Sequence, residues 1–158
     1  MKRTHIVMAL LAILFLVFSS PAFAQKFDLK MMTGPMGGSW YPLGGAIAEA
    51  LQKEIPGVTV SVMPGGGVAN VEAVEFGKCE LGFSNSSSAV DGLNGRDPFK
   101  KKMENMRQLA NLYAQYFQMV VVDSSKIKSA ADLKGKIIAT TQRGHTGTIL
   151  TEQVLQVY

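Results

Sequence analysis

Apolar and polar positions along the chain repeat in the order strand, loop, helix. Residues 27–31 alternate between apolar and polar side chains, which predicts a strand. Over residues 42–54 the apolar side chains recur every three or four positions, which predicts a helix. The same patterns predict a strand over 58–62, a helix over 68–76 and a short strand over 81–83. Strands that alternate with helices are typical of an α/β fold with a parallel sheet.

The second half of the chain is expected to hold further elements of the same kinds. Serines and an asparagine over 84–88 are good N-caps, so a helix is expected to start there and reach Leu93. Ser129 and Asp132 have the spacing of a capping box, which predicts one helical turn that Gly135 ends. The remaining predicted elements are strands over 106–113, 116–122 and 136–141 and a helix after the polar loop 142–148.

Three polar loops, rich in glycine or serine, directly follow the first three predicted strands. They lie around Gly38, Gly66 and Ser86. In a parallel sheet the loops that leave the carboxyl ends of the strands gather along one edge, and ligands bind there at helix N-termini. We therefore expect these loops to converge on one ligand-binding crevice.

The N-terminus has the features of a secretory signal peptide. Lys2 and Arg3 precede an apolar run over 6–18, and Ala22 to Ala24 form an A-x-A cleavage signal. The apolar run is shorter than the roughly 20 residues that span a bilayer. We expect cleavage after Ala24, a mature chain that starts at Gln25, and a periplasmic location.

The amino-acid composition favours a folded domain and excludes several kinds of site and partner. Hydrophobic residues make up 47% and charged residues 18% of the chain, which favours a folded domain over a disordered one. A single cysteine, Cys79, excludes an intramolecular disulfide and a Cys-based zinc site, and it is expected to be a partly buried structural thiol. The net charge of +4 is too small to indicate nucleic acid as a partner.

The sequence gives little support for catalysis or for a cofactor. The glycine loop 34–39 lacks the lysine of a phosphate-binding loop and the spacing of a dinucleotide fingerprint. No G-x-S-x-G surrounds the serines of 84–88, and His145 is the one histidine outside the leader. We expect no enzyme, no metal site and no cofactor. A loop whose backbone N–H groups hold a small carboxylate explains the glycines of 34–39 better than tight turns alone. Trp40 and Tyr41, just after this loop, are expected to line the ligand pocket rather than only to pack on the sheet.

The stretch from Gly37 to Gly45 resembles the G-G-[ST]-x-Y-P-x-G-G motif of the TAXI family. Members of this family are the solute receptors of tripartite ATP-independent periplasmic (TRAP) transporters. The resemblance covers nearly all of the chain after the leader. Its other segments are Pro56–Val58, the glycines ending at Gly67, Leu81–Phe83, Asn85–Ser86, Asn94–Gly95, Leu109–Tyr113 and Ile127–Lys136.

The resemblance implies a fold with two α/β lobes, similar to type 2 periplasmic binding proteins, that close on a ligand. Family receptors are longer than this chain, so we expect the first lobe to be largely present and the second lobe to be incomplete, with weak solute binding by this form. The expected division is a signal peptide over 1–24, a first lobe over 25–115, a crossover strand over 116–124, and the start of a second lobe over 125–158.

The resemblance also implies a function and a set of ligand-binding residues. The expected function is delivery of a small organic anion or amino acid, similar to glutamate or a dicarboxylate, to the membrane subunits of a TRAP transporter. The alternatives are a binding protein of an ATP-driven importer, a periplasmic sensor-input protein and a secreted Ser-His hydrolase. Loop 142–148 departs from the family pattern at its start, and Asn85 stands where the family often has Gln. The implied ligand-binding residues are Gly38, Ser39, Tyr41, Asn85, Ser86, Thr146 and Thr148.

Overall fold

The computed structural model describes residues 26–158, so the predicted signal peptide lies outside the described residues. A sheet of three parallel strands forms its centre: β1 (Phe27–Met32), β2 (Val58–Met63) and β3 (Leu81–Gly82), in the order β2-β1-β3. Phe27 lies opposite Val58 in the first pair, and Met32 lies opposite Gly82 in the second. The predicted parallel sheet is confirmed, and it is compatible with part of a periplasmic-binding-protein-like fold.

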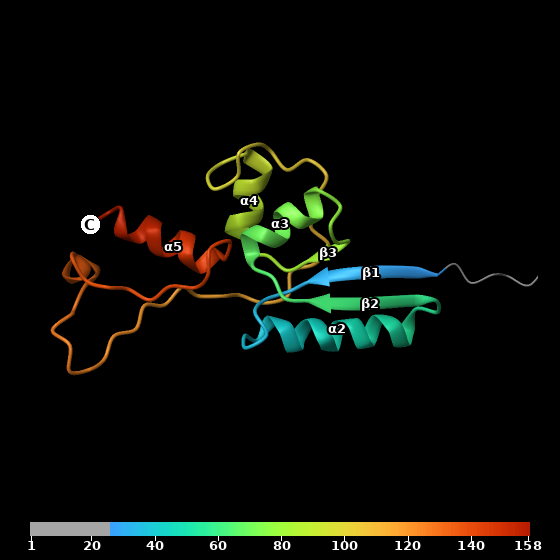
Figure 1. The fold of residues 1–158 in the computed structure, drawn as a ribbon, viewed down its shortest axis with the longest axis horizontal. Coiled ribbons are helices and arrows are strands. Elements are labelled where there is room, and N and C mark those ends of the chain that lie inside the picture. The colour runs from blue at the N-terminus through green and yellow to red at the C-terminus, as the bar shows by residue number, and fades with distance from the viewer. Residues whose placement is uncertain (1–25) are drawn as a thin grey trace, which may run out of the picture.

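Helices cover both faces of this sheet (Figure 1). Helix α2 (Trp40–Glu54) packs on one face, and α3 (Gly67–Glu75) and α4 (Ser86–Asn94) lie on the other. All three were predicted, although α2 starts two residues earlier than expected because Ser39 already occupies its N-cap position. Buried Gly44 lets α2 approach the sheet so closely that a Cβ atom there would overlap the Cγ2 methyl of Thr33.

The helices end where the glycines predict. Helix α2 stops at Glu54, just before the Pro56-Gly57 turn. Gly77 follows the C-cap of α3 with φ +65°, and Gly95 is the C-cap of α4 with φ +65°. Only glycine adopts this left-handed conformation without strain, which is why it terminates helices so often.

A small core holds α3 and α4 to the loop that follows them. Glu75, only 8% exposed, accepts hydrogen bonds from the backbone N–H (2.7 Å) and the Nδ2 (3.1 Å) of Asn105. The backbone N–H bond is the main cause that holds the pKa of Glu75 below its usual value. These bonds fasten the loop beside the buried side chains of Val68, Val71, Phe99, Met103 and Met106.

The prediction of strands over 106–113, 116–122 and 136–141 is wrong, and so is the secondary structure expected for the crossover strand 116–124. Within residues 26–158 the structure assigns strands to β1, β2 and β3 alone. Apolar residues such as Val120 (88% exposed) and Ile137 are strongly exposed in these segments. A sequence rich in β-branched residues forms a strand only when a neighbouring strand accepts its hydrogen bonds, and the described residues provide none here.

The last two elements agree with the sequence patterns. One 3₁₀ turn, η1 (Ala130–Leu133), is capped as predicted by Asp132, whose carboxylate accepts the N–H groups of Lys128 (2.9 Å) and Ser129 (2.8 Å). The first of these bonds is the main cause that lowers the pKa of Asp132. Helix α5 (Thr146–Leu155) is present as predicted, but it starts three residues earlier than expected, within the polar segment 142–148. Among the described residues, none of the helices has the length and apolar character needed to cross a membrane.

Candidate functional site

The loops that follow β1, β2 and β3 meet at the carboxyl edge of the sheet, as predicted. The N–H of Gly65 donates to the carbonyl of Gly34 (3.3 Å), which joins the first two loops. The hydroxyl of Ser84 donates to the carbonyl of Gly67 (2.9 Å), which joins the second and third. In Figure 1 the arrowheads of β1 and β2 point toward this edge, on the side where α5 lies.

One residue that holds this edge together was missed by the sequence analysis. Asn70, in α3, is 0% exposed, and its side-chain amide bonds to main-chain groups of all three loops or the strand ends beside them. The signal that marks it is a lone amide among apolar neighbours, directly after the glycines 65–67. A buried polar group of this kind persists only when its hydrogen bonds are made.

Ser39 and Tyr41 lie at the N-terminus of α2. Ser39 is exposed at the N-cap, and its hydroxyl makes no capping hydrogen bond with the helix. Gly38 precedes it in a tight turn, where its N–H donates to the carbonyl of Pro35 (2.8 Å). The first N–H groups of any helix lack intrahelical acceptors, so this end presents a hydroxyl beside partly positive backbone groups.

The Trp40 side chain packs against other residues of this sheet edge. Its ring lies edge-to-face against Phe83, with the centroids 5.9 Å apart and the planes at 75°. A Cβ atom on Gly34 would lie 2.8 Å from the Cβ of Trp40. Trp40 therefore joins the loop after β1 to the loop after β3, which favours the packing role over the pocket wall for this residue. Tyr41 lies half-buried in the first turn of α2.

The N-terminus of α4 brings a second pair of predicted residues to the same edge. Asn85 is the N-cap, and its Nδ2 donates to Oε1 of Gln115 (2.6 Å) instead of capping the helix. Ser86 is the first helical residue and is exposed. The hydroxyl of Ser86 and that of Ser39 thus stand at the starts of two helices that follow neighbouring strands.

Residues 142–148, which end in the first residues of α5, contact this edge from the far end of the chain, and we call this segment the docked loop. The Thr146 Oγ1 lies 2.8 Å from the Ser88 Oγ, and both residues are buried. The N–H of Ala69, in the first turn of α3, donates to the carbonyl of Gly144 (3.2 Å). A Cβ on Gly66 would overlap the ring of His145, so the glycine turn and the docked loop fit closely.

The two threonines predicted in the docked loop have different surroundings. A Cβ on Gly67 would overlap the Oγ1 of Thr146 and lie 3.1 Å from the Oδ1 of Asn85, so these two predicted residues share one neighbourhood. Thr148, in the first turn of α5, instead donates its hydroxyl to the carbonyl of Thr141 (2.6 Å), with the carbonyl of Gln142 also within 3.2 Å. Both hydroxyls are therefore engaged with protein groups.

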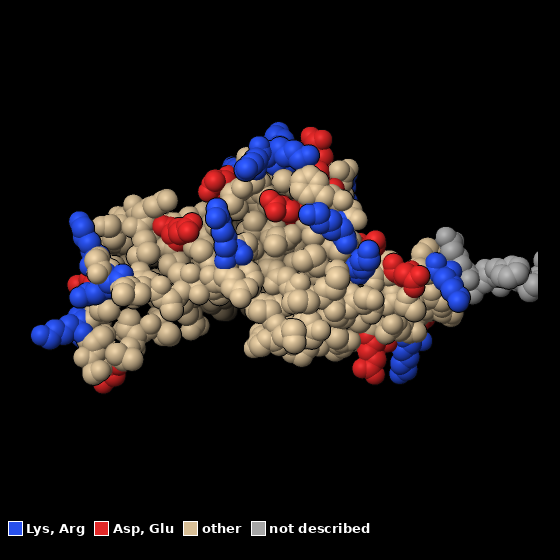
Figure 2. Space-filling view, in the orientation of Figure 1, with Lys and Arg blue, Asp and Glu red and all other residues tan. Residues whose placement is uncertain are grey.

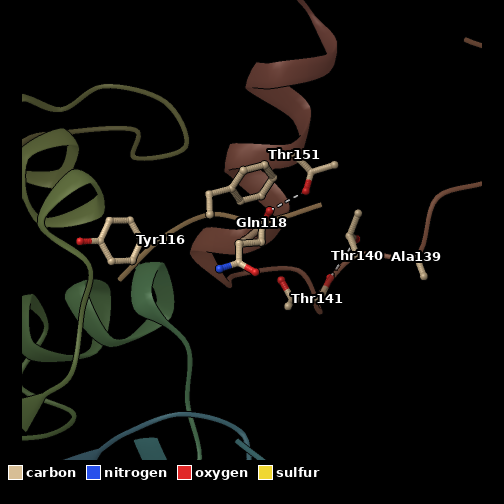
Figure 3. Close-up of a pocket in the computed structure, with 8 residues that line it drawn as sticks. Tyr116, Gln118, Ala139, Thr140, Thr141 and Thr151 are labelled. Carbon is tan, nitrogen blue, oxygen red and sulfur yellow. Dashed lines mark hydrogen bonds between the residues drawn. The ribbon is translucent and has the colours of Figure 1, made fainter. Parts of the chain in front are cut away.

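A cavity of about 540 Å³ lies beside α5 and is bordered by Gly147 of the docked loop (Figure 3). The side chains in Figure 3 come from an extended segment around Gln118, a second one around Thr140, and α5. None of the seven predicted ligand-binding residues lines it. The lining residues are Tyr116, Phe117, Gln118, Ala139, Thr140, Thr141, Gly147 and Thr151.

The distribution of charged side chains limits which groups of the converging loops can bind a ligand. The loops 33–39, 64–67 and 83–88 hold no ionisable side chain, and in Figure 2 the blue atoms gather instead above α3 and α4. Residues 26–158 contain no cluster of three or more His, Cys, Asp or Glu that could hold a metal ion. Burial raises the pKa of the Cys79 thiol, which is 2% exposed, as expected for a structural cysteine. Within the three loops, backbone N–H groups, hydroxyls and the Asn85 amide are the groups that can bind a ligand, and the docked loop adds Arg143 and His145.

Comparison with known protein families agrees with this arrangement. The model of the NMT1-like family matches residues 31–158, which include the end of β1, strands β2 and β3, helices α2 to α5 and the docked loop. That family has an extracytoplasmic solute-binding function, with small-molecule ligands and membrane transporters as partners. The chain belongs to the NMT1-like family, a periplasmic solute-binding family related to the TRAP/TAXI-type binding proteins.

Proposed function

We propose that this chain is the receptor of a TRAP-type secondary transporter, in the TAXI group, and that its solute carries a carboxylate. Membership of a solute-binding family supports a small-molecule ligand and a membrane transporter as partner. The G-G-S-W-Y-P-L-G-G stretch over 37–45 supports the TAXI group. Glutamate and small dicarboxylates are the solutes that fit a site of this chemistry best.

The observation that carries the proposal is the pair of helix N-termini at one sheet edge. Helices α2 and α4 start there with exposed serines, Ser39 and Ser86, in loops without ionisable side chains. A carboxylate near a helix N-terminus gains about 0.3–1 kcal/mol when exposed, and more where water is excluded. Two such ends can together hold one carboxylate without a cationic side chain.

Binding without chemistry is part of the proposal. The hydroxyl of Ser88 is paired with Thr146, and the His145 ring lies against Gly66. A Ser-His hydrolase needs a serine hydroxyl within hydrogen-bond reach of the imidazole, held by a third group. The surroundings of Ser88 and His145 favour a receptor over a hydrolase.

Replacing Ser39 or Ser86 with alanine should weaken solute binding. Loss of one hydrogen bond to a charged group costs about 1.5–3 kcal/mol, so each variant should bind roughly 10- to 150-fold more weakly. Isothermal titration calorimetry with L-glutamate and with succinate measures this directly. Ser87→Ala is the matched control, because Ser87 is also exposed in the first turn of α4 but is not among the implied ligand residues. Unchanged affinity in both Ser39→Ala and Ser86→Ala would remove these hydroxyls from the site.

We further propose that the chain is exported to the periplasm after removal of residues 1–24. The basic start, the apolar run over 6–18 and the Ala22–Ala24 signal support this location. Intact-mass measurement of the protein from a periplasmic extract should give a chain that starts at Gln25. A product that keeps Met1, or one that stays with the membrane fraction, would contradict the proposal.

A further inference from the structure

We propose that Asn70 is the positioning residue of the ligand site: it sets the arrangement of the three loops without touching the solute. This inference rests on the proposed function, because it concerns the same sheet edge. Asn70 is completely buried, so its side chain cannot reach a ligand in the crevice. Its effect on binding must therefore act through the main chain that it holds.

The hydrogen bonds of Asn70 reach each of the three loops. Its Oδ1 accepts the N–H of Gly66 (3.1 Å), in the loop before α3. Its Nδ2 donates to the carbonyls of Thr33 (2.7 Å), after β1, and Phe83 (2.8 Å), after β3. The carbonyl of Met32 lies 3.2 Å from the same nitrogen and shares its hydrogens. One side chain thereby fixes the distances among three segments that are far apart in the sequence.

The glycines around Asn70 are arranged to admit it. A Cβ on Gly65 would overlap the Oδ1 of Asn70, and a Cβ on Gly82 would lie 3.2 Å from its Cβ. The N–H of Gly65 also donates to the carbonyl of Gly34. The space that the Asn70 amide fills therefore lies where the first two loops join. Part of the glycine content of this edge is therefore explained by the amide and not by a ligand.

Only an asparagine supplies both halves of this network. Aspartate has nearly the same shape and still accepts from Gly66, but its second oxygen would face the carbonyls of Thr33 and Phe83. Four acceptors, this oxygen and the carbonyls of Met32, Thr33 and Phe83, would then meet where the amide supplied two hydrogens. A protonated carboxyl supplies one hydrogen at most, and water cannot enter the buried site to replace the other. The loops bearing Ser39 and Ser86 follow Thr33 and Phe83 directly, so this repulsion displaces the ligand-binding hydroxyls.

The test compares Asn70→Asp with Val71→Ala in the full chain. Val71 is 4% exposed in the same helix and belongs to the core beside Phe99, so its truncation destabilises α3 without touching the loops. We expect both variants to lower the melting temperature. Only Asn70→Asp should weaken L-glutamate or succinate binding, by about tenfold or more, which corresponds to a distortion of about 1.4 kcal/mol. Equal affinity in Asn70→Asp and Val71→Ala would overturn the proposal.

Amide hydrogen exchange tests the same inference without a ligand. In the unaltered chain the Gly66 N–H should exchange slowly, at a rate near that of the β1 amides, because its acceptor is completely buried. A Gly66 amide that exchanges as fast as the exposed Gly37 amide would also overturn the proposal, even if Asn70→Asp fails to fold. If the unaltered chain binds neither probe, even at concentrations high enough to detect the weak binding expected of this form, while Gly66 is protected, the carboxylate assignment fails and the role of Asn70 in holding the loops stands.

Discussion

Gly44→Ala should destabilise the chain, whereas Gly45→Ala, one residue later in the same helix, should stabilise it. A Cβ at position 44 would overlap the Thr33 Cγ2, but a Cβ at position 45 would meet nothing within 4 Å. Overpacking of this kind costs about 1–3 kcal/mol. Replacing an unconstrained helical glycine with alanine gains about 0.5–1 kcal/mol. Urea unfolding of the two variants and the unaltered chain measures both differences.

The cost at position 44 arises because Thr33 cannot move away. Thr33 is 0% exposed, its hydroxyl donates to the carbonyl of Met63 (3.0 Å), and its N–H donates to the same oxygen (2.9 Å). The double variant Gly44→Ala/Thr33→Ser supplies the control, since serine keeps the hydroxyl and removes the methyl group that would clash. It should recover much of the lost stability. Equal effects of Gly44→Ala and Gly45→Ala would refute the close approach of α2 to the sheet.

The first half of the fold was predictable because its signals are local. Apolar alternation over 27–31 and 58–62 predicted β1 and β2, and the glycines 77 and 95 lie at the ends of α3 and α4. The convergence of the loops followed from the parallel order of strands and helices alone. In contrast, the segment 116–122 has the composition of a strand but lacks a pairing strand among the described residues. The composition of a segment does not show whether another strand lies beside it to accept its hydrogen bonds.

The candidate site was predictable in its position and not in its internal contacts. Ser39 and Ser86 lie where the strand-loop-helix order places helix starts, and their role in ligand binding stays a prediction. Asn70 was missed because a lone asparagine in a short helix has no periodicity to reveal it. The contact between Gly66 and His145 joins positions that are far apart in the sequence, so no local pattern contains it.

Breaking the hydroxyl pair between Ser88 and Thr146 should release the docked loop and α5 from the sheet edge. The two oxygens are 2.8 Å apart, and the residues are 4% and 6% exposed, so water cannot replace a lost partner. Thr146→Val keeps the shape of the side chain and leaves the Ser88 hydroxyl without this partner. A buried hydroxyl without a hydrogen-bond partner costs about 1–3 kcal/mol. This cost destabilises the contact between the docked loop and the sheet edge and does not affect the three-stranded sheet. Amide exchange should therefore speed up over α5, while the amides of β1 and β2 stay protected.

A double-mutant cycle separates this pair from a general loss of packing. Ser88→Ala should cost a similar amount, because it leaves the Thr146 hydroxyl alone. The double variant Ser88→Ala/Thr146→Val should cost less than the sum of the single variants, with a coupling of about 0.5–3 kcal/mol.

Thr148→Val is the comparison within the same loop. Its hydroxyl bonds only to Thr141 and Gln142 and is exposed, so its loss should change stability by less than the Thr146 change does. Additive costs at Ser88 and Thr146, or slow exchange throughout α5 in the Thr146→Val variant, would show that other contacts hold the docked loop in place. Release of the docked loop and α5 must also break the contacts of the Gly144 carbonyl, of the His145 ring, and of Ile149 in α5, which packs against the core that holds Val68.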